Sequence, residues 1–574
     1  MSSAVHNWFN SEVFLWRNLA SVFWSILKIP VVLIFFNFLS GLSITHPLEW
    51  LFGTFAVVLT SRFWLCALVN TACLVLVSRF TIPHFSVAAD IDSSMLMSVL
   101  NLLRWKRLPL LVISSVSGAV SAWSLSGLIG PEYGSLTTVI EPETRLTVLN
   151  ETHLFIVASG ILAGICSFVF FFRDRQYFLA FPNVHRLKLF RVKNGTLQLF
   201  KTTSWLSLHV VKYFYILYCL FGEVPKMWIT RSFNINNNPN VPEFSTFVGL
   251  FNPSLFWQTY LCTFFIIFMW SLARIMIRIY HTERIEFCVN NVLAEDADKN
   301  LADALSCKES SILQHLAFLD LNWLSKYSPS RRQELLSLSQ PGGHPRAWVA
   351  TSSAALQAVR ELCDAIRDEN TAVMSRVSVS AQKSVSNFSS SSYNPSAAGD
   401  SYSSTFLNTD GSVTPSSSDE DVKTPSPLMK WISSLGNLPF LSQLIAEYPD
   451  ISSRRLFSYC QMHIWAVEAL SQIASKSITE DKYGVVQTIL PSLIRTLLDL
   501  YEAMEKHFKL TTSVLRRTNG VYDGPPDALL RFELHAINKA AIYRIVNSYQ
   551  LHLEDLRIGQ DYFRKLQPFI AYHA

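Results

Sequence analysis

Histidines and a glycine pair are the residues of this sequence whose types and spacing could do chemistry. His463, which lies near Glu468 in the sequence, and His535 are the two candidates for acid–base catalysis in the C-terminal half. Histidine is the side chain that most often transfers protons in enzymes. Neither has a nucleophile or a set of metal ligands at a diagnostic spacing, which favours core or surface histidines. Gly342 and Gly343 belong to no GxxxxGK[ST] motif and follow no predicted strand, which excludes a phosphate-binding loop. The sequence therefore predicts no enzyme active site.

Cysteines are the other residues that could bind a metal. None of the nine belongs to a Cys-x-x-Cys pair, and no histidine lies at a zinc-ligand spacing from one. We therefore expect these cysteines to behave as small buried hydrophobic residues and to bind no metal. We also expect the protein to bind no cofactor, small-molecule substrate or nucleic acid. The nine are Cys66, Cys73, Cys166, Cys219, Cys262, Cys288, Cys307, Cys363 and Cys460.

The charge of the chain divides it into two unlike parts. Of 574 residues, 16% are charged and 50% are hydrophobic, whereas soluble domains carry about 25% charged residues. Residues 1–280 hold 20 basic and 11 acidic residues, a net charge of +9. Residues 281–574 hold 28 basic and 32 acidic residues, a net charge of −4. This composition excludes a disordered chain and a simple cytosolic enzyme, and it indicates a membrane domain followed by a soluble one.

Apolar segments in the first part are long enough to cross a membrane. A bilayer core of about 30 Å needs about 20 mostly apolar residues in a helix. The sequence predicts an all-α fold: a six-span transmembrane helical bundle over 1–280, followed by a cytosol-facing α-helical domain that a disordered Ser-rich linker interrupts. The predicted spans are 19–42, 55–77, 108–129, 153–172, 204–222 and 254–271.

The positions of Lys and Arg predict the orientation of these spans. The N-terminal tail, the loops 78–107 and 173–203, and the stretch after span six carry 14 of the 20 basic residues. Basic residues gather on the cytosolic side of membrane proteins. We therefore expect both termini on the cytosolic side, with three short loops on the other side.

The 173–203 loop alternates basic with apolar residues, as segments on an anionic membrane surface do. The other interpretation is that its charges only fix the topology, and the two are compatible. The basic residues predicted to lie on the membrane surface are Arg173, Arg175, Arg186, Lys188, Arg191 and Lys193.

Lys28, Arg62 and Lys212 are charges inside the predicted spans. Such charges suggest an ion or substrate path, and the alternative function is accordingly a polytopic transporter or channel with a cytosolic regulatory domain. No acidic residue lies in a predicted span to pair with them. Each is also near enough to a membrane face for its side chain to reach water. Snorkelling is the favoured interpretation.

The second part contains the soluble helices. We expect a first part of the cytosolic helical domain over 281–377, a disordered linker over 378–427 and a C-terminal helical domain over 428–574. Ser328 suits a helix N-cap and Pro329 the first helical position. Arg331 and Arg332 could bind a phosphate or a partner's carboxylate, although a salt bridge within the domain or a solvated helix face is favoured.

The linker is predicted to be disordered because 17 of the 50 residues from Ser378 to Pro427 are serine, without a sustained apolar period. Its Ser/Thr-Pro pairs and its serines before an acidic run are contexts that kinases favour, and each phosphate adds about −1.5 to −2 charges. An unmodified linker is the alternative. The candidate phosphorylation sites are Thr414, Ser416, Ser418, Thr424 and Ser426.

Several longer motifs resemble one known family, the nuclear division cycle transmembrane nucleoporin. The first two are Tyr327-Ser-Pro-Ser-Arg-Arg-Gln-Glu334 and Ser339-Gln-Pro-Gly-Gly-His-Pro345. Others are Gln461-Met-His-Ile-Trp465, Thr479-Glu-Asp-Lys-Tyr-Gly-Val-Val-Gln-Thr488, His46-Pro-Leu-Glu-Trp50 and Glu223-Val-Pro-Lys226. They span the chain in order.

The resemblance implies an integral membrane nucleoporin of the nuclear envelope that anchors the nuclear pore complex in the pore membrane and is required for pore assembly. It implies a lipid bilayer around the spans and other nucleoporins as partners: the propeller-repeat protein aladin, the inner-ring linker nucleoporin and other membrane nucleoporins. It supplies no catalytic residues. The motif residues that are candidates for binding a partner are Ser328, Pro329, Arg331, Arg332, Gln333, Gly342, Gly343 and His344.

Overall fold

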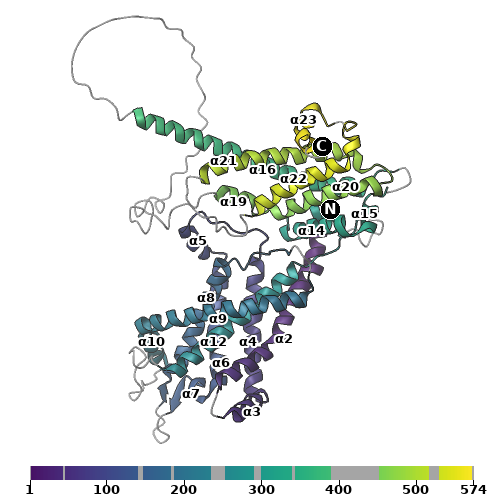
Figure 1. Cartoon of the computed structure of the whole chain (residues 1–574). Helices are drawn as coiled ribbons and strands as arrows, with labels where there is room; N and C mark the ends of the chain where they lie inside the picture. The colour runs from purple at the N-terminus through teal and green to yellow at the C-terminus, as the bar shows by residue number, and fades with distance from the viewer. Residues whose placement is uncertain are drawn as a thin grey trace, which may run out of the picture.

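The computed structural model describes residues 2–42, 46–139, 147–182, 186–233, 252–289, 299–338, 343–389, 451–515, 529–556 and 558–571. Figure 1 shows two groups of helices stacked end to end: long helices from the N-terminal part below, and helices from the C-terminal part, teal to yellow, above. Nearly every described element is a helix. The expected all-α class is confirmed.

Six helices of the lower group are long and apolar enough to cross a membrane. These helices cover Ala4–Ser40, Ser61–His84, Leu108–Ile129, Glu151–Arg173, Lys188–Phe221 and Pro253–His281. The elements of this group are α1 (Ser2–Trp8), the π-helix η1 (Phe9–Phe14), α2 (Leu15–Ser40), α3 (Pro47–Val58), α4 (Ser61–Thr81), η2 (Ile82–His84), α5 (Met95–Leu102), α6 (Leu108–Ile129), α7 (Pro131–Gly134), β1 (Thr137–Val139), β2 (Thr147–Leu149), α8 (Glu151–Arg173), α9 (Lys188–Phe221), α10 (Glu223–Phe233) and α12 (Pro253–His281).

The expected second span, 55–77, was wrong in its bounds. The chain turns after α3 ends at Val58, and Thr60 takes an extended backbone with ψ 146° before α4 begins at Ser61. The 12 residues of α3 cover about 18 Å, too little for a bilayer core of about 30 Å. Hydropathy cannot detect this turn, because the residues around it are as apolar as a span.

The helices that contain the expected fifth and sixth spans, 204–222 and 254–271, are longer than those spans. α9 begins at Lys188 and α12 continues to His281. Basic residues end an apolar window, but Lys and Arg are good helix formers and do not end a helix. Much of the predicted basic loop is therefore part of α9, and Arg274 and Arg278 belong to α12.

α12 is the central helix of the membrane domain. It packs against α2, α4, α6, α8 and α9, which surround it in Figure 1. Asn252 caps its first turn, where its Oδ1 accepts hydrogen bonds from the N–H groups of Ser254 and Leu255 at 3.0 and 3.3 Å. Phe265 packs edge to face on Phe36 with ring centroids 5.5 Å apart. The helix is apolar on every side, as expected of a buried helix.

Small residues let α6 and α8 approach closely. A Cβ on Gly160 would lie 2.4 Å from Cβ of Ala122 and 2.5 Å from the carbonyl oxygen of Gly118. A Cβ on Gly164 would lie 2.2 Å from the carbonyl oxygen of Ser114. The sequence from Gly160 to Gly164 is a GxxxG motif, which membrane helices use to pack backbone against backbone.

A short hairpin lies at the end of the membrane domain away from the C-terminal helices (Figure 1). β1 pairs antiparallel with β2, with Thr137 opposite Leu149. Asn150 follows the hairpin, and its amide nitrogen donates to the carbonyls of Glu132 and Ser135 at 2.7 and 2.9 Å. This asparagine is the glycan acceptor of an Asn-Glu-Thr sequon, but its amide is buried and already bonded.

The upper group forms one domain with a continuous core. Its elements are α13 (Leu301–Ser306), α14 (Ser311–Tyr327), α15 (Pro329–Leu335), α16 (Arg346–Ser389), α19 (Ile451–Phe457), α20 (Cys460–Glu480), η4 (Val486–Thr488), α21 (Leu490–Leu515), α22 (Leu530–Ser548), η6 (Gln550–His552) and α23 (Gln560–Ala571). α14 packs on α20, and α16 packs on α21, so both sides of the predicted linker share this core.

The predicted linker lies mostly outside the described residues. α16 continues past residue 378 and ends at Ser389, so the helix occupies the first residues of the range that we expected to be linker. The five candidate phosphorylation sites, Thr414 to Ser426, lie outside the described residues.

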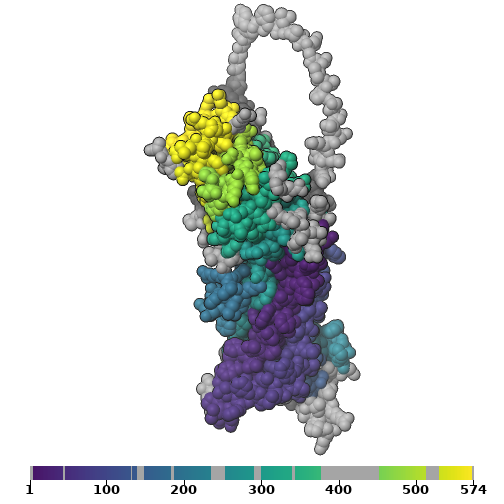
Figure 2. Space-filling view, turned by 90° about the vertical axis from the view of Figure 1, so that its right-hand side faces the viewer, coloured from purple at the N-terminus to yellow at the C-terminus, as the bar shows by residue number. Residues whose placement is uncertain are grey.

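The N-terminal segment belongs to the core of the upper domain. The first span was expected to start at residue 19, but the helical run begins near the N-terminus, and α1 packs on α13. Val5 and Phe9 are buried in the same cluster as Leu301 and Leu305. Figure 2 shows the purple N-terminal surface running from the lower body up to the teal surface of the upper domain.

We predict that Gly160→Ala destabilises the membrane domain by about 1–3 kcal/mol, because the added methyl group collides with the backbone of α6. The matched control is Gly127→Ala on α6, where a Cβ would have nothing within 4 Å. The control should be neutral or slightly stabilising. Thermal unfolding of the full chain in detergent measures both, and equal midpoints for the two variants would contradict the close crossing.

Candidate functional site

The segment 328–345, the candidate partner face, begins with a short helix on the upper domain. α15 starts where the sequence predicted, with Pro329 in its first turn and Ser328 at the N-cap position. The Ser328 hydroxyl, however, makes no capping hydrogen bond. The fixed φ of the proline is therefore the local feature that favours a helix start here.

Two arginines of this segment are used inside the domain. The Arg331 guanidinium donates to both carboxylate oxygens of Asp320 at 2.9 and 2.7 Å. It also donates to the carbonyl of Phe287 at 2.7 Å. Burial alone would lower the pKa of Arg331, but its bonds to Asp320 raise it. Arg331 thus joins α15 to the connector that follows α12.

Arg332 is buried, and it binds Glu480 at the end of α20. Its Nε and Nη2 donate to the two carboxylate oxygens at 2.9 and 2.7 Å. These hydrogen bonds lower the pKa of Glu480. A bidentate pair of this kind fixes the position of α15 on the domain. Both arginines follow the favoured interpretation, a salt bridge within the domain.

The remaining candidate residues divide by exposure. Pro329, Gln333 and His344 are exposed, Ser328 and Gly343 are half-buried, and Gly342 lies outside the described residues. Tyr327, which precedes them, exposes 63% of its surface. The side chains that a partner could reach are therefore those of Tyr327, Pro329, Gln333 and His344.

The histidines considered for catalysis are packed into the upper domain. His463 is buried, and burial lowers its pKa to about 4. His315 lies close to it and is also buried, with its pKa lowered to about 4. His535 pairs with Glu505 at 2.9 Å and stacks on Tyr501. None of these contacts brings a nucleophile to a base.

The nine cysteines are free thiols, and six of them are buried, as expected of small hydrophobic residues. One group of potential metal ligands, unforeseen from sequence spacing, occurs among the described residues: His6, Cys307 and Glu309 place ligand atoms within 4.8 Å of one another. Three donors are one fewer than a structural zinc site uses, and we assign no metal to them.

The predicted membrane-surface arginines and lysines lie where the two domains meet. Arg173 ends α8, and Lys188 and Lys193 are exposed on α9 with Arg186 just before it. Arg191 turns inward instead, and its guanidinium donates to the hydroxyl of Thr282 at 2.8 Å and to the carbonyl of Ile279 at 3.4 Å. It thereby caps the C-terminal end of α12, which has a partial negative charge.

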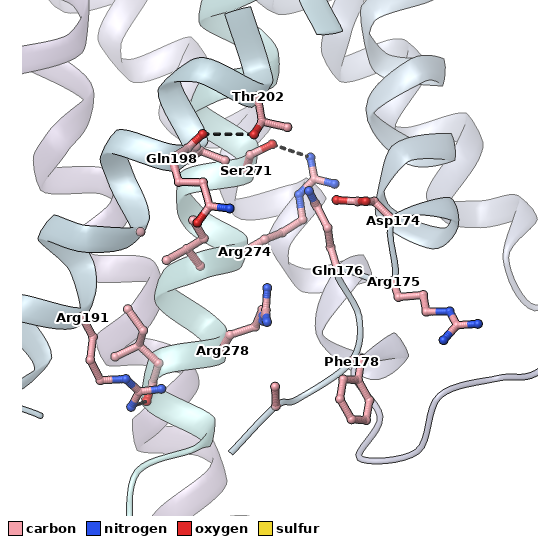
Figure 3. A pocket seen from close by; sticks show the side chains of 15 residues that line it. Asp174, Arg175, Gln176, Phe178, Arg191, Gln198, Thr202, Ser271, Arg274 and Arg278 are labelled. Carbon is pink, nitrogen blue, oxygen red and sulfur yellow. Dashed lines mark hydrogen bonds between the residues drawn. The ribbon is translucent and has the colours of Figure 1, made fainter. Parts of the chain in front are cut away.

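Arg191 also lines a cavity of about 630 Å³ between α9, α12 and the turn after α8. Figure 3 shows Arg274 and Arg278 entering it from α12, with Asp174, Gln176 and Phe178 on the opposite side. From the sequence, Arg274 and Arg278 were counted only as basic residues after span six, and their position in the lining of a cavity was not predicted. Their spacing of four, within a run that is otherwise apolar, is the signal for two charges on one helix face.

The membrane domain also exposes apolar side chains beside these charges. α5 and the residues after it, between spans two and three, expose Met95, Val99, Leu100, Leu103 and Trp105. Amphipathic segments with aromatic and basic residues lie in the interface plane of a bilayer.

Comparison with known proteins assigns the family. The family model described as "Nucleoporin protein Ndc1-Nup" matches residues 12–567. This chain belongs to the Ndc1 nucleoporin family. It is 29% identical to Nucleoporin NDC1 of Homo sapiens, over 97% of this chain and 96% of that protein. It is 30% identical to Nucleoporin NDC1 of Xenopus laevis, over 97% and 98% of the two chains, and 22% identical to Nucleoporin Ndc1 of Drosophila melanogaster, over 96% of each.

Membership of the Ndc1 family agrees with the resemblance of the sequence motifs and with the six apolar helices. The chain is a nucleoporin of the nuclear pore membrane. The family identity suggests a structural role, so the described histidine and arginine contacts are read as parts of a scaffold.

We predict that Asp320→Asn destabilises the upper domain by about 3–5 kcal/mol, because it leaves Arg331 without its buried counter-charge. The matched control is Glu361→Gln, which breaks the exposed pair with Lys308 at 2.7 Å and should cost about 1 kcal/mol or less. Thermal unfolding followed by tryptophan fluorescence measures both. If the two variants unfold together, the Asp320 network does not join the connector to the domain.

We also predict that acid weakens the upper domain through His463. Its folded pKa of about 4 lies below the ordinary value of about 6.5, so the unfolded chain binds the proton more readily. The stability that the neutral His463 side chain contributes to the upper domain is full above about pH 6.5 and is lost as the pH falls toward 4. His463→Gln should reduce the fall in melting temperature between pH 7 and pH 5, whereas the exposed control His552→Gln should not. An unchanged fall in the His463 variant would contradict the assignment.

Proposed function

We propose that this chain anchors the nuclear pore scaffold in the pore membrane and serves in pore assembly. Its six spans hold it in the bilayer, and its helical C-terminal domain recruits scaffold nucleoporins. The match to the Ndc1 nucleoporin model over residues 12–567 is the observation that carries this proposal. The connections between the two domains, which an anchor needs in order to transmit force, support it.

The first connection is the cytosolic end of α12. Arg17 of span one donates to the carbonyls of His281 and Glu283 at 3.2 and 2.8 Å. His281 also bonds the side chain of Asn18 at 2.8 Å. Together with Arg191 from span five, these contacts satisfy the carbonyls that the end of a helix leaves free. Spans one, five and six are thus fastened together where the chain leaves the membrane.

The second connection is the segment that follows α12. The N–H of Phe287 donates to the buried carboxylate of Asp320 at 3.1 Å, and Arg284 lies over the ring of Trp323 at 4.6 Å. The membrane loops add further contacts, since Phe181 packs edge to face on Trp465 at 5.5 Å. Arg455 donates to the carbonyl of Ile91 at 3.0 Å. These bonds favour a rigid junction over a flexible tether.

The proposed orientation places both termini on the cytosolic or nucleoplasmic side. The positive-inside distribution of Lys and Arg supports it. So does the packing of α1 on α13, which puts the N-terminal segment beside the C-terminal domain.

We place the partner contacts on the exposed side chains of the recognised motif: Tyr327, Pro329, Gln333 and His344. Aromatic and long polar side chains that are exposed and held by a rigid helix are suited to interfaces. The proposed partners are the aladin-like propeller protein, the inner-ring linker nucleoporin and other membrane nucleoporins. Phosphates on the linker sites Thr414 to Ser426 would add negative charge beside this domain and tune these contacts.

We predict that Tyr327→Ala weakens capture of these nucleoporins from cells at least about tenfold, in keeping with an exposed aromatic anchor, while the chain stays at the nuclear rim. The control is Tyr483→Ala, a similarly exposed tyrosine elsewhere on the domain. A fragment without the spans should lose the rim in cells that lack the endogenous protein. If that fragment still localises to the nuclear rim, the anchoring role is overturned. If the two tyrosine variants capture equal amounts of the nucleoporins, the placement of the partner face is overturned.

A further inference from the structure

The arginine-lined cavity lies at the depth of lipid headgroups. About 20 residues of helix cross a bilayer core of about 30 Å, and counting 20 from Pro253 along α12 reaches the stretch between Ser271 and Arg274. Counting back from Phe221 along α9 reaches Thr202. Both positions line the cavity, so two independent helices place it at the edge of the hydrocarbon core. This depth does not depend on the orientation of the chain.

Two of the arginines at the cavity are held in place by the protein itself. Arg274 is 6% exposed, and it donates to the carbonyls of Trp270 and Ser167 at 3.2 and 3.0 Å. It also donates to the hydroxyls of Ser167 and Ser271. Arg191 is fixed on the end of α12. The guanidinium groups of Arg274 and Arg191 therefore supply positive charge at fixed positions. Among the described residues, neither group is bonded to a carboxylate.

Arg278 is different, because its guanidinium has no hydrogen-bond or ion-pair partner among the described residues. In Figure 3 it points from α12 into the space between α9 and the segment that carries Gln176. Asp174 lines the same cavity but forms no ion pair with it within 4 Å. A half-buried guanidinium with five donors and no acceptor is costly unless a ligand supplies one.

The charge and the access of the cavity favour an anion that comes from the membrane. Arg191, Arg274 and Arg278 against Asp174 give a net charge of +2, and Arg175 points away from the centre in Figure 3. The rim residues Gln198 and Thr202 are exposed on α9. The same helix exposes apolar Leu197, Phe200 and Trp205, a surface on which acyl chains can lie.

We propose that this cavity binds a phosphate group, that of an anionic phospholipid in the leaflet beside the C-terminal domain. Arg278 would hold the phosphate oxygens through its forked donors, a geometry that suits phosphate, and Arg274 and Arg191 would supply supporting charge. The lipid would thereby bridge spans five and six and the turn after α8. This site goes beyond anchorage by the spans, which needs only their hydrophobicity.

The test is native mass spectrometry of the purified full chain in detergent, titrated with dioctanoyl phosphatidic acid. Arg278→Gln should weaken binding at least about tenfold, since a hydrogen bond to a charged group is worth about that factor. The matched control Lys201→Gln removes the same charge from an exposed position of α9 that does not line the cavity, and it should leave binding within about twofold. Equal binding by the wild type and the Arg278 variant overturns the proposal.

Asp174→Asn separates a ligand site from an internal ion pair. If the cavity binds phosphate, removing the carboxylate strengthens binding several-fold and leaves the melting temperature unchanged. If Asp174 is instead the counter-charge of Arg278, the variant lowers the melting temperature without stronger binding, which overturns the proposal. This readout also remains informative if Arg278→Gln fails to fold.

A parallel titration with inorganic phosphate identifies the source of the group. The lipid should bind at least about tenfold more tightly than inorganic phosphate, because its acyl chains add buried apolar area. If inorganic phosphate binds as tightly and depends equally on Arg278, a soluble phosphate is the ligand and the lipid is overturned. If only a phosphorylated peptide of residues 408–427 binds, the phosphate comes from the chain's own linker, and the lipid is again overturned.

Discussion

The burial of α12 is the constraint on which the rest of the structure depends. A helix surrounded by five others must be apolar on every side, and its polar ends must find partners within the protein. Asn252 satisfies the first turn, and Arg17 and Arg191 satisfy the last through the carbonyls of His281 and Ile279. The arginines that complete the helix come from spans one and five. The end of α12 therefore fixes those spans and sets the direction in which the chain enters the C-terminal domain.

The same helix end explains why the junction is rich in arginine. Carbonyls at a helix C-terminus attract cations, and a membrane interface tolerates arginine because the guanidinium reaches the headgroup layer. Arg274 and Arg278 follow α12 through this layer, but within the part of the chain that the structure describes only Arg274 has protein acceptors. The cation at Arg278 is thus a consequence of packing, and the proposed anion site depends on it. The proposed anchorage and the proposed lipid site therefore share one helix end.

Local patterns predicted much of this fold. The six apolar helices follow from hydrophobicity alone, and the start of α15 follows from Pro329. What the sequence could not predict depends on contacts between distant residues. The turn at Thr60 has no composition signal, and the pairs of Arg331 with Asp320 and Arg332 with Glu480 form only when α14, α15 and α20 pack. The close approach of α6 and α8 was detectable in the GxxxG motif at Gly160. The position of Arg278 on the same helix face as Arg274 was detectable as well, because the apolar pattern of α12 continues past Arg274.

The recognised motif itself requires a revised interpretation. A long segment shared with a family suggests a binding face, but Arg331 and Arg332, its most distinctive residues, face inward. Asp320 lies at the centre of this arrangement, because it joins Arg331 to the backbone that leaves the membrane. The motif therefore specifies how the C-terminal domain is joined to the spans, and only its outer residues are left to meet a partner. The proposed anchoring of a scaffold requires a rigid joint as much as a binding surface, since a partner bound to a loosely tethered domain would not be held at the membrane.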